Sequence, residues 1–380
     1  MDFSLTEEQQ LIHQTVREFA ERELRPHATQ WDREGVFPRA LTPKIAELGL
    51  WGMTVPSAYG GSEVDVLSMA LAIEALAWGD GGVALSVASH NSLCTGHLVL
   101  FASEEQKRRY LPALASGETL GAWCLTEPGA GSDAGAIQTR AERRNGDWIL
   151  SGTKVFVTQG SIGGVYVVMA VSDPAAGRDG ISAFIVERDN PGLRVGKKED
   201  KLGVRSSDTA EVVFEECVVT DAALVGRPGE GYRQAMRVLE GGRIGIAAMA
   251  LGLGRAALDA SVSYAQDRRA FGRPIGEHQA LGFMMADMAA ELDAAWLLVA
   301  RAATLAQAGR PFRREASMAK LYAAEAAARA AARGVQIHGG YGFVKGAAVE
   351  RIYRDVKLTE IGEGTSEIQR IIIAKSLLEE

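Results

Sequence analysis

The spacing of apolar and polar residues predicts helices in the first third of the chain. Apolar residues recur on one helical face between residues 12 and 20, and Thr6 with Gln9 forms a capping-box signature just before them. Pro26 predicts a kink or an end to this first helix. Segments 41–53, 65–80 and 103–118 show further short helical patterns, which Gly and Pro residues separate.

The pattern changes near residue 119 to short runs rich in β-branched residues. Asn145-Gly146 lies between two runs that can alternate, which is a strong signal for a β-hairpin. Segments 164–172, 180–189 and 209–219 are expected strands separated by turn residues. About a hundred residues therefore form a predicted small β domain.

The helical period returns near residue 229. Segments 230–268, 278–309 and 314–340 are long, and the last two are apolar or alanine-rich almost all round. Such helices must be buried on several faces, in a bundle core or against another subunit, so an oligomer is expected. The predicted fold is mainly α with a central β domain: residues 1–118 helical, 119–228 β and 229–380 helical. Their junction is the expected place for a ligand cleft.

Composition excludes several classes of function. The chain has 380 residues and a net charge of -7, which does not suggest nucleic-acid or acidic-membrane binding. No targeting signal or membrane-spanning run is visible, so a cytoplasmic protein or the mature form of an organellar one is expected. The three cysteines form no CxxC pair, which indicates buried, reduced thiols. The six histidines include no HExxH pair, so no metal site is predicted.

The C-terminal stretch IGEGTSEIQR, residues 361–370, carries the most specific chemical hypothesis. Glu363 lies between Gly362 and Gly364, and Thr365 begins another amphipathic run. One interpretation is a glutamate in a solvated loop. The other is a base that reaches into a cleft, where partial dehydration raises the pKa of a carboxyl group.

Six segments together resemble the acyl-CoA dehydrogenase family over essentially the whole chain. They are AWCLTEPGAGSD (122–133), KVFVTQG (154–160), KLGVRSSDTAEVVFEECVV (201–219), DRRAFGRPIGEHQ (267–279), QIHGGYGF (336–343) and IGEGTSEIQR (361–370). The resemblance implies an N-terminal helical domain, a β-barrel-like middle domain and a C-terminal four-helix bundle. It also implies a homotetramer, a dimer of dimers, with one FAD per subunit.

The resemblance implies two groups of cofactor residues. The first would line the flavin and the adjoining chain: Leu125, Thr126, Gly131, Ser132, Phe156, Thr158, Thr365 and Glu367. The second would come from the neighbouring subunit and hold the dinucleotide: Arg268, Phe271, Gln279, Gln336, Gly339 and Gly340. Phe156 stands where many relatives have tryptophan. Taken singly, these segments could also be ordinary turns and a charged inter-helix loop.

The acyl-CoA site would include Ser132, Glu240, Arg243 and Gly364 by the same resemblance. Some relatives carry the catalytic glutamate immediately before this arginine, but the residue here is Gly242. Glu363 remains as the expected base. It would remove the α-proton of a thioester while the β-hydrogen leaves as hydride to flavin N5.

The expected reaction converts a short- to medium-chain acyl-CoA to a trans-2-enoyl-CoA, as in fatty-acid β-oxidation. The resemblance implies that the electrons pass to an electron-transfer flavoprotein. An acyl-CoA oxidase or a branched-chain acyl-CoA dehydrogenase is an alternative on the same scaffold. Nitroalkane oxidases and related monooxygenases of this fold are disfavoured by Glu363. A non-catalytic helical scaffold is the alternative of another class.

Overall fold

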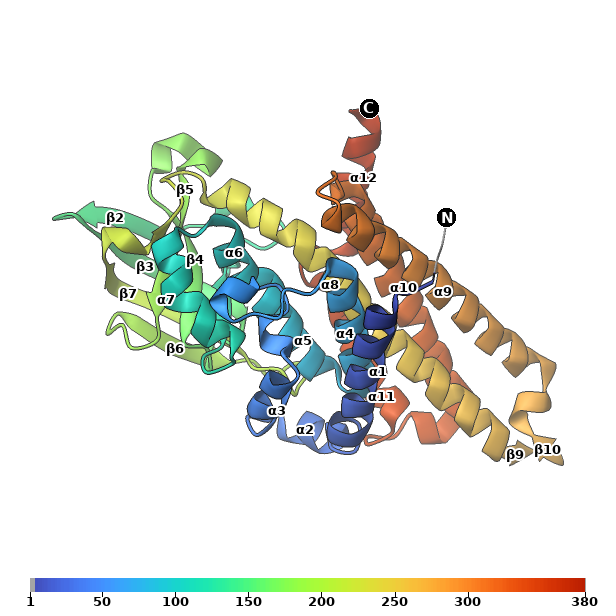
Figure 1. The fold of residues 1–380 in the computed structure, drawn as a ribbon. Coiled ribbons are helices and arrows are strands. Elements are labelled where there is room, and N and C mark those ends of the chain that lie inside the picture. The colour runs from blue at the N-terminus through green and yellow to red at the C-terminus, as the bar shows by residue number, and fades with distance from the viewer. Residues whose placement is uncertain (1–3, 380) are drawn as a thin grey trace.

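A computed structural model describes residues 4–379, and it has the predicted three-part architecture. Figure 1 shows the β domain at one end of the molecule and two sets of helices beside it. The domain limits at residues 1 and 380 lie outside the described residues. The mainly helical fold with a central sheet is confirmed.

The N-terminal helices follow the sequence pattern closely. Helix α1 (Glu7–Phe19) begins with the capping box expected at Thr6 and Gln9. It continues as a π-helix (Ala20–Leu24), and the chain turns at Pro26 before α2 (Ala28–Glu34). The α- and π-helices that follow in this described region are α3 (Leu41–Glu47), α4 (Val66–Gly79), α5 (Gly81–Ser89), the π-helix η4 (His90–Thr95), α6 (Gly96–Phe101) and α7 (Glu104–Ala115).

The β domain consists mainly of one eight-stranded sheet. Its strands are β1 (Gly121–Cys124), β2 (Arg140–Arg144), β3 (Asp147–Thr158), β4 (Val165–Val171), β5 (Ile181–Glu187), β6 (Leu193–Lys198), β7 (Thr209–Val219) and β8 (Leu224–Val225). The order is β6-β7-β3-β2-β4-β5-β8, and β1 pairs in parallel with β4. Asn145 and Gly146 both have positive φ and connect β2 to β3, which confirms the predicted hairpin.

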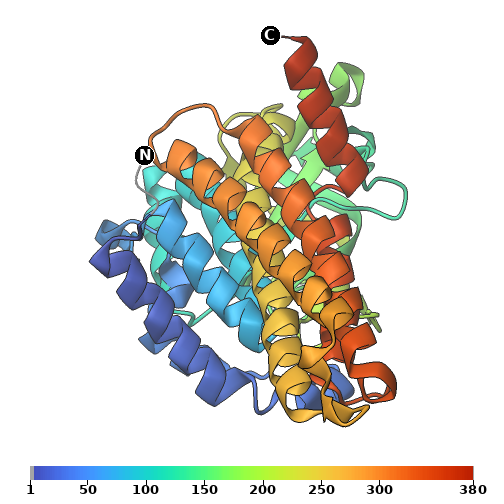
Figure 2. The ribbon, with the colours of Figure 1, turned by 90° about the vertical axis from the view of Figure 1, so that its right-hand side faces the viewer.

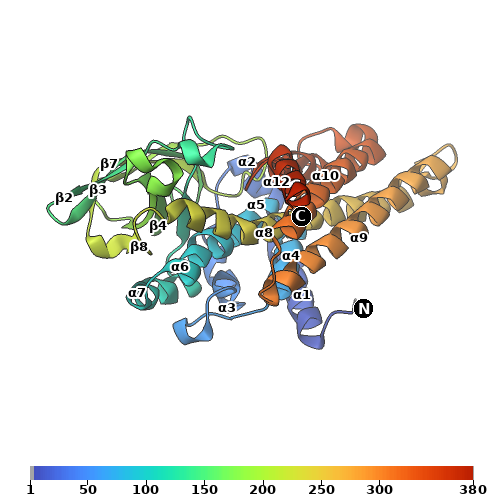
Figure 3. The same ribbon diagram turned by 90° about the horizontal axis from the view of Figure 1, so that it is seen from above.

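Five α-helices lie in the described part of the C-terminal domain, and the longest links it to the β domain. They are α8 (Gly231–Asp267), α9 (Gln279–Gln307), α10 (Arg313–His338), α11 (Ala348–Ile361) and α12 (Ser366–Leu378). Figure 3 shows α8 running from the β domain into the helical region. Figure 2 shows α9 and α10 side by side, and α12 projecting beyond them toward the C-terminus.

Helix α8 crosses the centre of the molecule. It is long and apolar enough to span a membrane by length and composition, but 78% of its most apolar window is buried inside the protein, as in a core helix. Close packing explains its glycines: a Cβ added at Gly252 would lie 2.1 Å from the Glu74 carbonyl oxygen of α4. The site described below is built around this helix.

Two buried histidines fasten β1 to the helices. The Gly121 N–H donates to His90 Nδ1 at 3.0 Å, while His90 Nε2 lies 3.1 Å from the Leu114 oxygen. His97 similarly accepts from Trp123 Nε1 at 3.2 Å. Burial lowers the pKa of both imidazoles to about 4, so both are neutral near pH 7 and keep one acceptor nitrogen. The three cysteines are buried and unpaired, as predicted.

Candidate active site between helix α8 and the α11–α12 turn

The turn between α11 and α12 is made by Glu363 and Gly364. Their φ angles are 54° and 96°, and Thr365 then caps α12 by accepting from the Ile368 N–H. Gly362 has φ -63°, so of the two glycines beside Glu363 only Gly364 has the positive φ that favours glycine. Glu363 itself takes the left-handed conformation, which is unfavourable for a residue with a Cβ and is typical of functional sites.

This turn directs the Glu363 carboxylate inward against α8. A Cβ added at Gly242 would lie 1.9 Å from Glu363 Oε2 and 3.2 Å from Leu93 Cδ2 of η4. Glu363 Oε2 is buried and has no hydrogen-bond partner among the described residues. The interpretation of Glu363 as a solvated loop residue is therefore wrong. The small residue at 242 makes room for a carboxylate that arrives from another helix.

Two buried cations act on this carboxylate. Burial raises the pKa of Glu363 to about 7, and the charges of Lys320 and Arg243 oppose that rise. Burial also lowers the pKa of Lys320 to about 8 and that of Arg243 to about 10. Arg243 Nε and Nη1 have no hydrogen-bond partner in the described part of the chain. A carboxyl group with a pKa near 7 is suited to accept a proton at neutral pH.

Glu240 does not join the Glu363 carboxylate. Its Oε2 lies 2.6 Å from Arg237 Nη1, and its Oε1 lies 3.9 Å from Arg313 Nε. It is partly buried one turn before Arg243 on α8, and its charge raises the pKa of that arginine. Its expected role in acyl-CoA binding stays a prediction.

The end of β1 is braced against β3 by a buried ion pair. Lys154 Nζ lies 2.7 Å from Glu127 Oε1 and donates to the Leu125 oxygen at 3.1 Å. The Val155 N–H donates to the Thr126 oxygen at 2.9 Å. Leu125 and Thr126 are thereby held beside the segment that contains Phe156 and Thr158. The structure thus brings these four predicted flavin residues together.

The other predicted residues around this loop are open to solvent. Gly131 and Ser132 are exposed, and a Cβ at Gly131 would meet nothing within 4 Å. Phe156 has φ 56° and a 65% exposed side chain on β3. A large apolar ring this exposed beside a glycine-containing loop has free area for a planar ligand.

The second predicted cofactor group lies at the other end of the C-terminal domain. Arg268 ends α8, and Phe271, 95% exposed, lies in the hairpin of β9 (Arg269–Ala270) and β10 (Arg273–Pro274). Gln279 is exposed at the start of α9, and Gln336, Gly339 and Gly340 are exposed where α10 ends. The Arg268 guanidinium lies 5.5 Å from the centre of the Tyr341 ring, which joins the two segments.

The two groups do not meet within one chain. Figure 1 shows the β9–β10 hairpin at the end of α8 and α9 that is remote from the β domain, and Figure 3 agrees in placing the end of α9 far from the sheet. Arg268, Phe271 and Gln279 are thus separated from Thr126 and Phe156. The prediction that a neighbouring subunit contributes the second group is compatible with this separation.

Comparison with known proteins identifies the family. Three family models match: the acyl-CoA dehydrogenase N-terminal domain over residues 6–118, the middle domain over 122–217 and the C-terminal domain over 229–378. The chain belongs to the acyl-CoA dehydrogenase family. It is 48% identical over 379 residues to a probable acyl-CoA dehydrogenase of Bacillus subtilis, covering 100% of both chains.

Solved structures of this family are similar over the whole chain. Butyryl-CoA dehydrogenase from Megasphaera elsdenii has a TM-score of 0.97 at 41% identity, covering 100% of each chain. A structure described for the electron transferring flavoprotein of Acidaminococcus fermentans has a TM-score of 0.98 at 45% identity, also covering 100% of each. The protein is therefore an oxidoreductase of a FAD-dependent family.

The residues present fit FAD. An added Cβ would meet nothing within 4 Å at Gly131 of the first group or at Gly339 and Gly340 of the second, and the same holds for Gly129, two residues before Gly131. Open glycine loops allow close approach of a ligand to the backbone, and an exposed arginine can bind a pyrophosphate. Thr365 is half-buried at the cap of α12, whereas Glu367 is exposed in the first turn of that helix. Their contacts with FAD stay predictions.

Sequence reasoning missed Lys320, Glu127 and Lys154. Lys320 is fully buried on α10, and its Nζ donates to the Gly364 oxygen at 2.8 Å. The available signal was a lysine within the alanine-rich part of this helix, because a charge buried there needs a partner. Glu127 and Lys154 had no such signal, since their pairing depends on where β1 and β3 meet.

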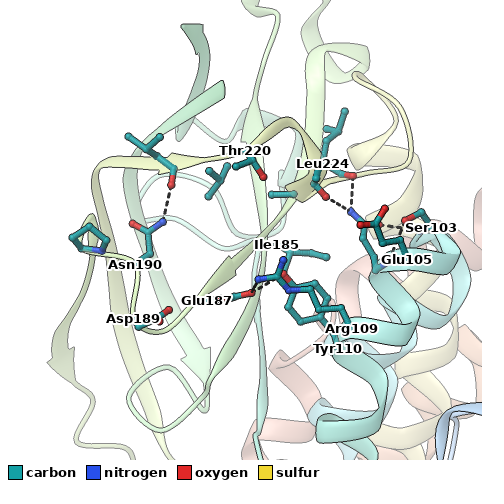
Figure 4. A pocket seen from close by; sticks show the side chains of 16 residues that line it. Ser103, Glu105, Arg109, Tyr110, Ile185, Glu187, Asp189, Asn190, Thr220 and Leu224 are labelled. Atoms are coloured by element: carbon teal, nitrogen blue, oxygen red, sulfur yellow. Dashed lines mark hydrogen bonds and ion pairs between the residues drawn. The ribbon is translucent and has the colours of Figure 1, made fainter. Parts of the chain in front are cut away.

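A separate cavity of about 490 Å³ lies between α7 and the edge of the sheet (Figure 4). Polar contacts connect α7 to β5 at this cavity. Arg109 Nη2 lies 2.6 Å from Glu187 Oε1, and the Tyr110 hydroxyl donates to the same oxygen at 2.8 Å. Gln106 Nε2 donates to the Leu224 oxygen at 2.9 Å. None of the predicted site residues lines this cavity.

Proposed function

We propose that the protein catalyses α,β-dehydrogenation of an acyl-CoA thioester, with Glu363 as the base. The supporting observation is the Glu363 carboxylate itself. One of its oxygens is buried and has no hydrogen-bond partner among residues 4–379, and burial raises the pKa of the group to about 7. A carboxylate in this state can remove a weakly acidic proton from carbon.

Other residues of the chain would bind the cofactor and the substrate and would stabilise the developing enolate. Bound FAD would supply the oxidant that accepts the β-hydrogen as hydride. The backbone N–H of Glu363 would donate to the thioester carbonyl and so stabilise the developing enolate. Gly364 and Arg243 would contribute to acyl-CoA binding, and Gly242 leaves space for the carboxylate. Leu125, Thr126, Phe156 and Thr158 would bind and orient the flavin.

The proposed substrate is a short- to medium-chain acyl-CoA. The similarity to butyryl-CoA dehydrogenase over the complete chain supports the shorter end of this range. Anaerobic titration of the FAD-loaded protein with acyl-CoAs of increasing length tests both the activity and the substrate. The flavin absorbance is expected to bleach most readily with butyryl-CoA. Failure of every straight-chain and branched acyl-CoA to bleach it would contradict the proposal.

The proposed electron acceptor is an electron-transfer flavoprotein. The chain matches one chain of the structure described for the electron transferring flavoprotein of Acidaminococcus fermentans, and this match supports such a partner. Acyl-CoA oxidase activity is the alternative, and oxygen distinguishes the two. Slow reoxidation of the substrate-reduced enzyme by oxygen while product is bound supports a dehydrogenase. Rapid reoxidation would support an oxidase.

We also propose a homotetramer, a dimer of dimers, in which each cofactor site is completed by a neighbour. The separation of Arg268 and Phe271 from Thr126 and Phe156 within one chain supports it. Sedimentation of the FAD-loaded protein should give four chains and four flavins per particle. A stable monomer that retains FAD would contradict shared sites.

A further inference from the structure

A buried lysine on α10 lies next to the turn that contains the proposed base. Lys320 has no exposed area, and its Nζ donates to the Gly364 oxygen at 2.8 Å, immediately after Glu363 in the chain. Buried lysines are rare unless a partner compensates the charge. A backbone carbonyl compensates it only in part, so the remaining partner must be a nearby negative charge. Among the charged groups that act on Lys320, Glu363 has the largest effect, and it raises the pKa of the lysine.

We infer that Lys320 is a positioning residue for Glu363: its ammonium group holds the Glu363–Gly364 turn against α10 and presents a positive charge to the proposed base. This inference rests on the proposed role of Glu363. It adds a function for a residue on α10 that does not contact the reacting atoms.

The hydrogen bonds of the turn allow the effect of the Lys320 charge to be distinguished from the effect of its hydrogen bond. The Gly364 oxygen accepts from Lys320 Nζ and also from Gln369 Nε2, both at 2.8 Å. Gln369 is fully buried on α12. The two donors therefore hold the same carbonyl, but only Lys320 carries a charge. Loss of either should loosen the left-handed turn at Glu363.

The charge of Lys320 acts in a defined electrostatic surrounding. The charged groups that act on Glu363 are Lys320 on α10 and Arg243 on α8. Those that act on Lys320 are Glu363, Arg243, Glu360 and Glu367. Burial raises the pKa of Glu363, and each cation lowers it. Removing Lys320 should therefore raise the pKa of the proposed base further, because Arg243 would remain as the only cation acting on it among the described residues.

The test compares Lys320→Met with Gln369→Met in the FAD-loaded enzyme. The measurement is the rate of flavin bleaching by saturating butyryl-CoA, or by whichever acyl-CoA bleaches the wild type best, from pH 5.5 to 9. Both variants should react more slowly than the wild type. Only Lys320→Met should shift the acid limb of the profile upward, by about one pH unit. Lys320→Arg, which retains the charge, should restore that limb toward the wild-type position.

Lys201→Met is a control for the loss of another lysine whose pKa is lowered by burial. Lys201 Nζ also donates to a backbone carbonyl, that of Ser207 at 2.7 Å, and burial likewise lowers its pKa to about 8. It does not act on Glu363. This variant should leave the pH profile unmoved.

An unshifted acid limb in Lys320→Met, or an equal shift in Gln369→Met, would overturn the inference. If Lys320→Met does not retain FAD, Lys320→Gln provides the same neutral comparison. Loss of FAD from both neutral variants would count against the inference, because it would show that Lys320 serves the fold. Failure of the wild type to bleach with any acyl-CoA would instead reject the proposed function, so the two failures are distinguishable.

Discussion

At the scale of single residues, the proposed chemistry depends on the protonation state of one carboxyl group. Burial favours the protonated form of Glu363, whereas two buried cations, Lys320 and Arg243, favour its ionised form. The resulting pKa of about 7 lies where a base is both ionised and basic. The absence of a side chain at Gly242 is as necessary as the charges, because the carboxylate occupies that space.

Gly242→Ala should slow substrate-dependent flavin bleaching. The added Cβ would lie 1.9 Å from Glu363 Oε2, so the carboxylate must move. A displacement of about 1 Å can cost about 10²-fold in rate. Stopped-flow absorbance with butyryl-CoA measures it. Gly241→Ala on the same helix is the matched control, since its Cβ would meet nothing within 4 Å, and it should retain most of the activity. Equal effects in both variants would contradict the role of Gly242.

At the scale of elements, the position of the loop after β1, which contains the predicted flavin residues Leu125 and Thr126, depends on how β1 and β3 are joined. Glu127 accepts from the Gln138 and Thr139 N–H groups at 2.6 and 2.9 Å, in addition to its pair with Lys154. Both side chains of the ion pair are buried, at 7% and 0% exposed. A buried pair of this kind is costly to break from one side, because the remaining charge has no solvent.

Lys154→Met should destabilise the protein by about 3–5 kcal/mol, since Glu127 would remain buried and unpaired. Chemical denaturation followed by tryptophan fluorescence measures the change, and FAD should dissociate more readily. Lys154→Met combined with Glu127→Gln should recover part of the lost stability, because no isolated charge remains. If the double variant is as unstable as the sum of the two single variants, the two residues are not coupled.

Helices, strands and the three-part order followed from the sequence because local periodicity and caps determine them. Thr6 with Gln9 and Asn145 with Gly146 are examples in which the local signal was sufficient. Glu363 and Arg243 were identified by resemblance. They are 120 positions apart in the sequence, and only the packing of α8 against the α11–α12 turn brings them together. The alanine-rich sequence around Lys320 shows that its charge needs a partner, but it does not show which one, because that partner is the backbone carbonyl of Gly364.

At the scale of the whole molecule, a buried cluster joins all three domains. Asp355 on α11 accepts from the Val204 N–H of the β domain at 2.5 Å. Asp80, at the start of α5, accepts from Ser206 Oγ at 2.6 Å and lies 3.5 Å from Arg351 Nη1. Burial raises the pKa of Asp355 to about 7, while the Arg351 charge opposes the rise. The junction of the three domains therefore contains a carboxyl group whose pKa is raised well above its ordinary value.

The stability of this junction should depend on pH. Asp355 has a pKa of about 7 when folded, compared with 3.8 as its ordinary value. A raised pKa stabilises the fold below the ordinary value, and the contribution is lost as pH rises through 7. Between pH 5 and pH 8, the wild type should lose about 2–3 kcal/mol relative to Asp355→Asn. Denaturation of both proteins at each pH measures it, and a constant difference would contradict the assignment.

The most direct test of the central claim is Glu363→Gln in the FAD-loaded protein. The amide is nearly the same size but cannot accept the α-proton, so FAD should stay bound while anaerobic bleaching by acyl-CoA slows by at least about 10²-fold. Bleaching at the wild-type rate, at any pH between 6 and 8, would show that the proton is taken by another group and would contradict the account.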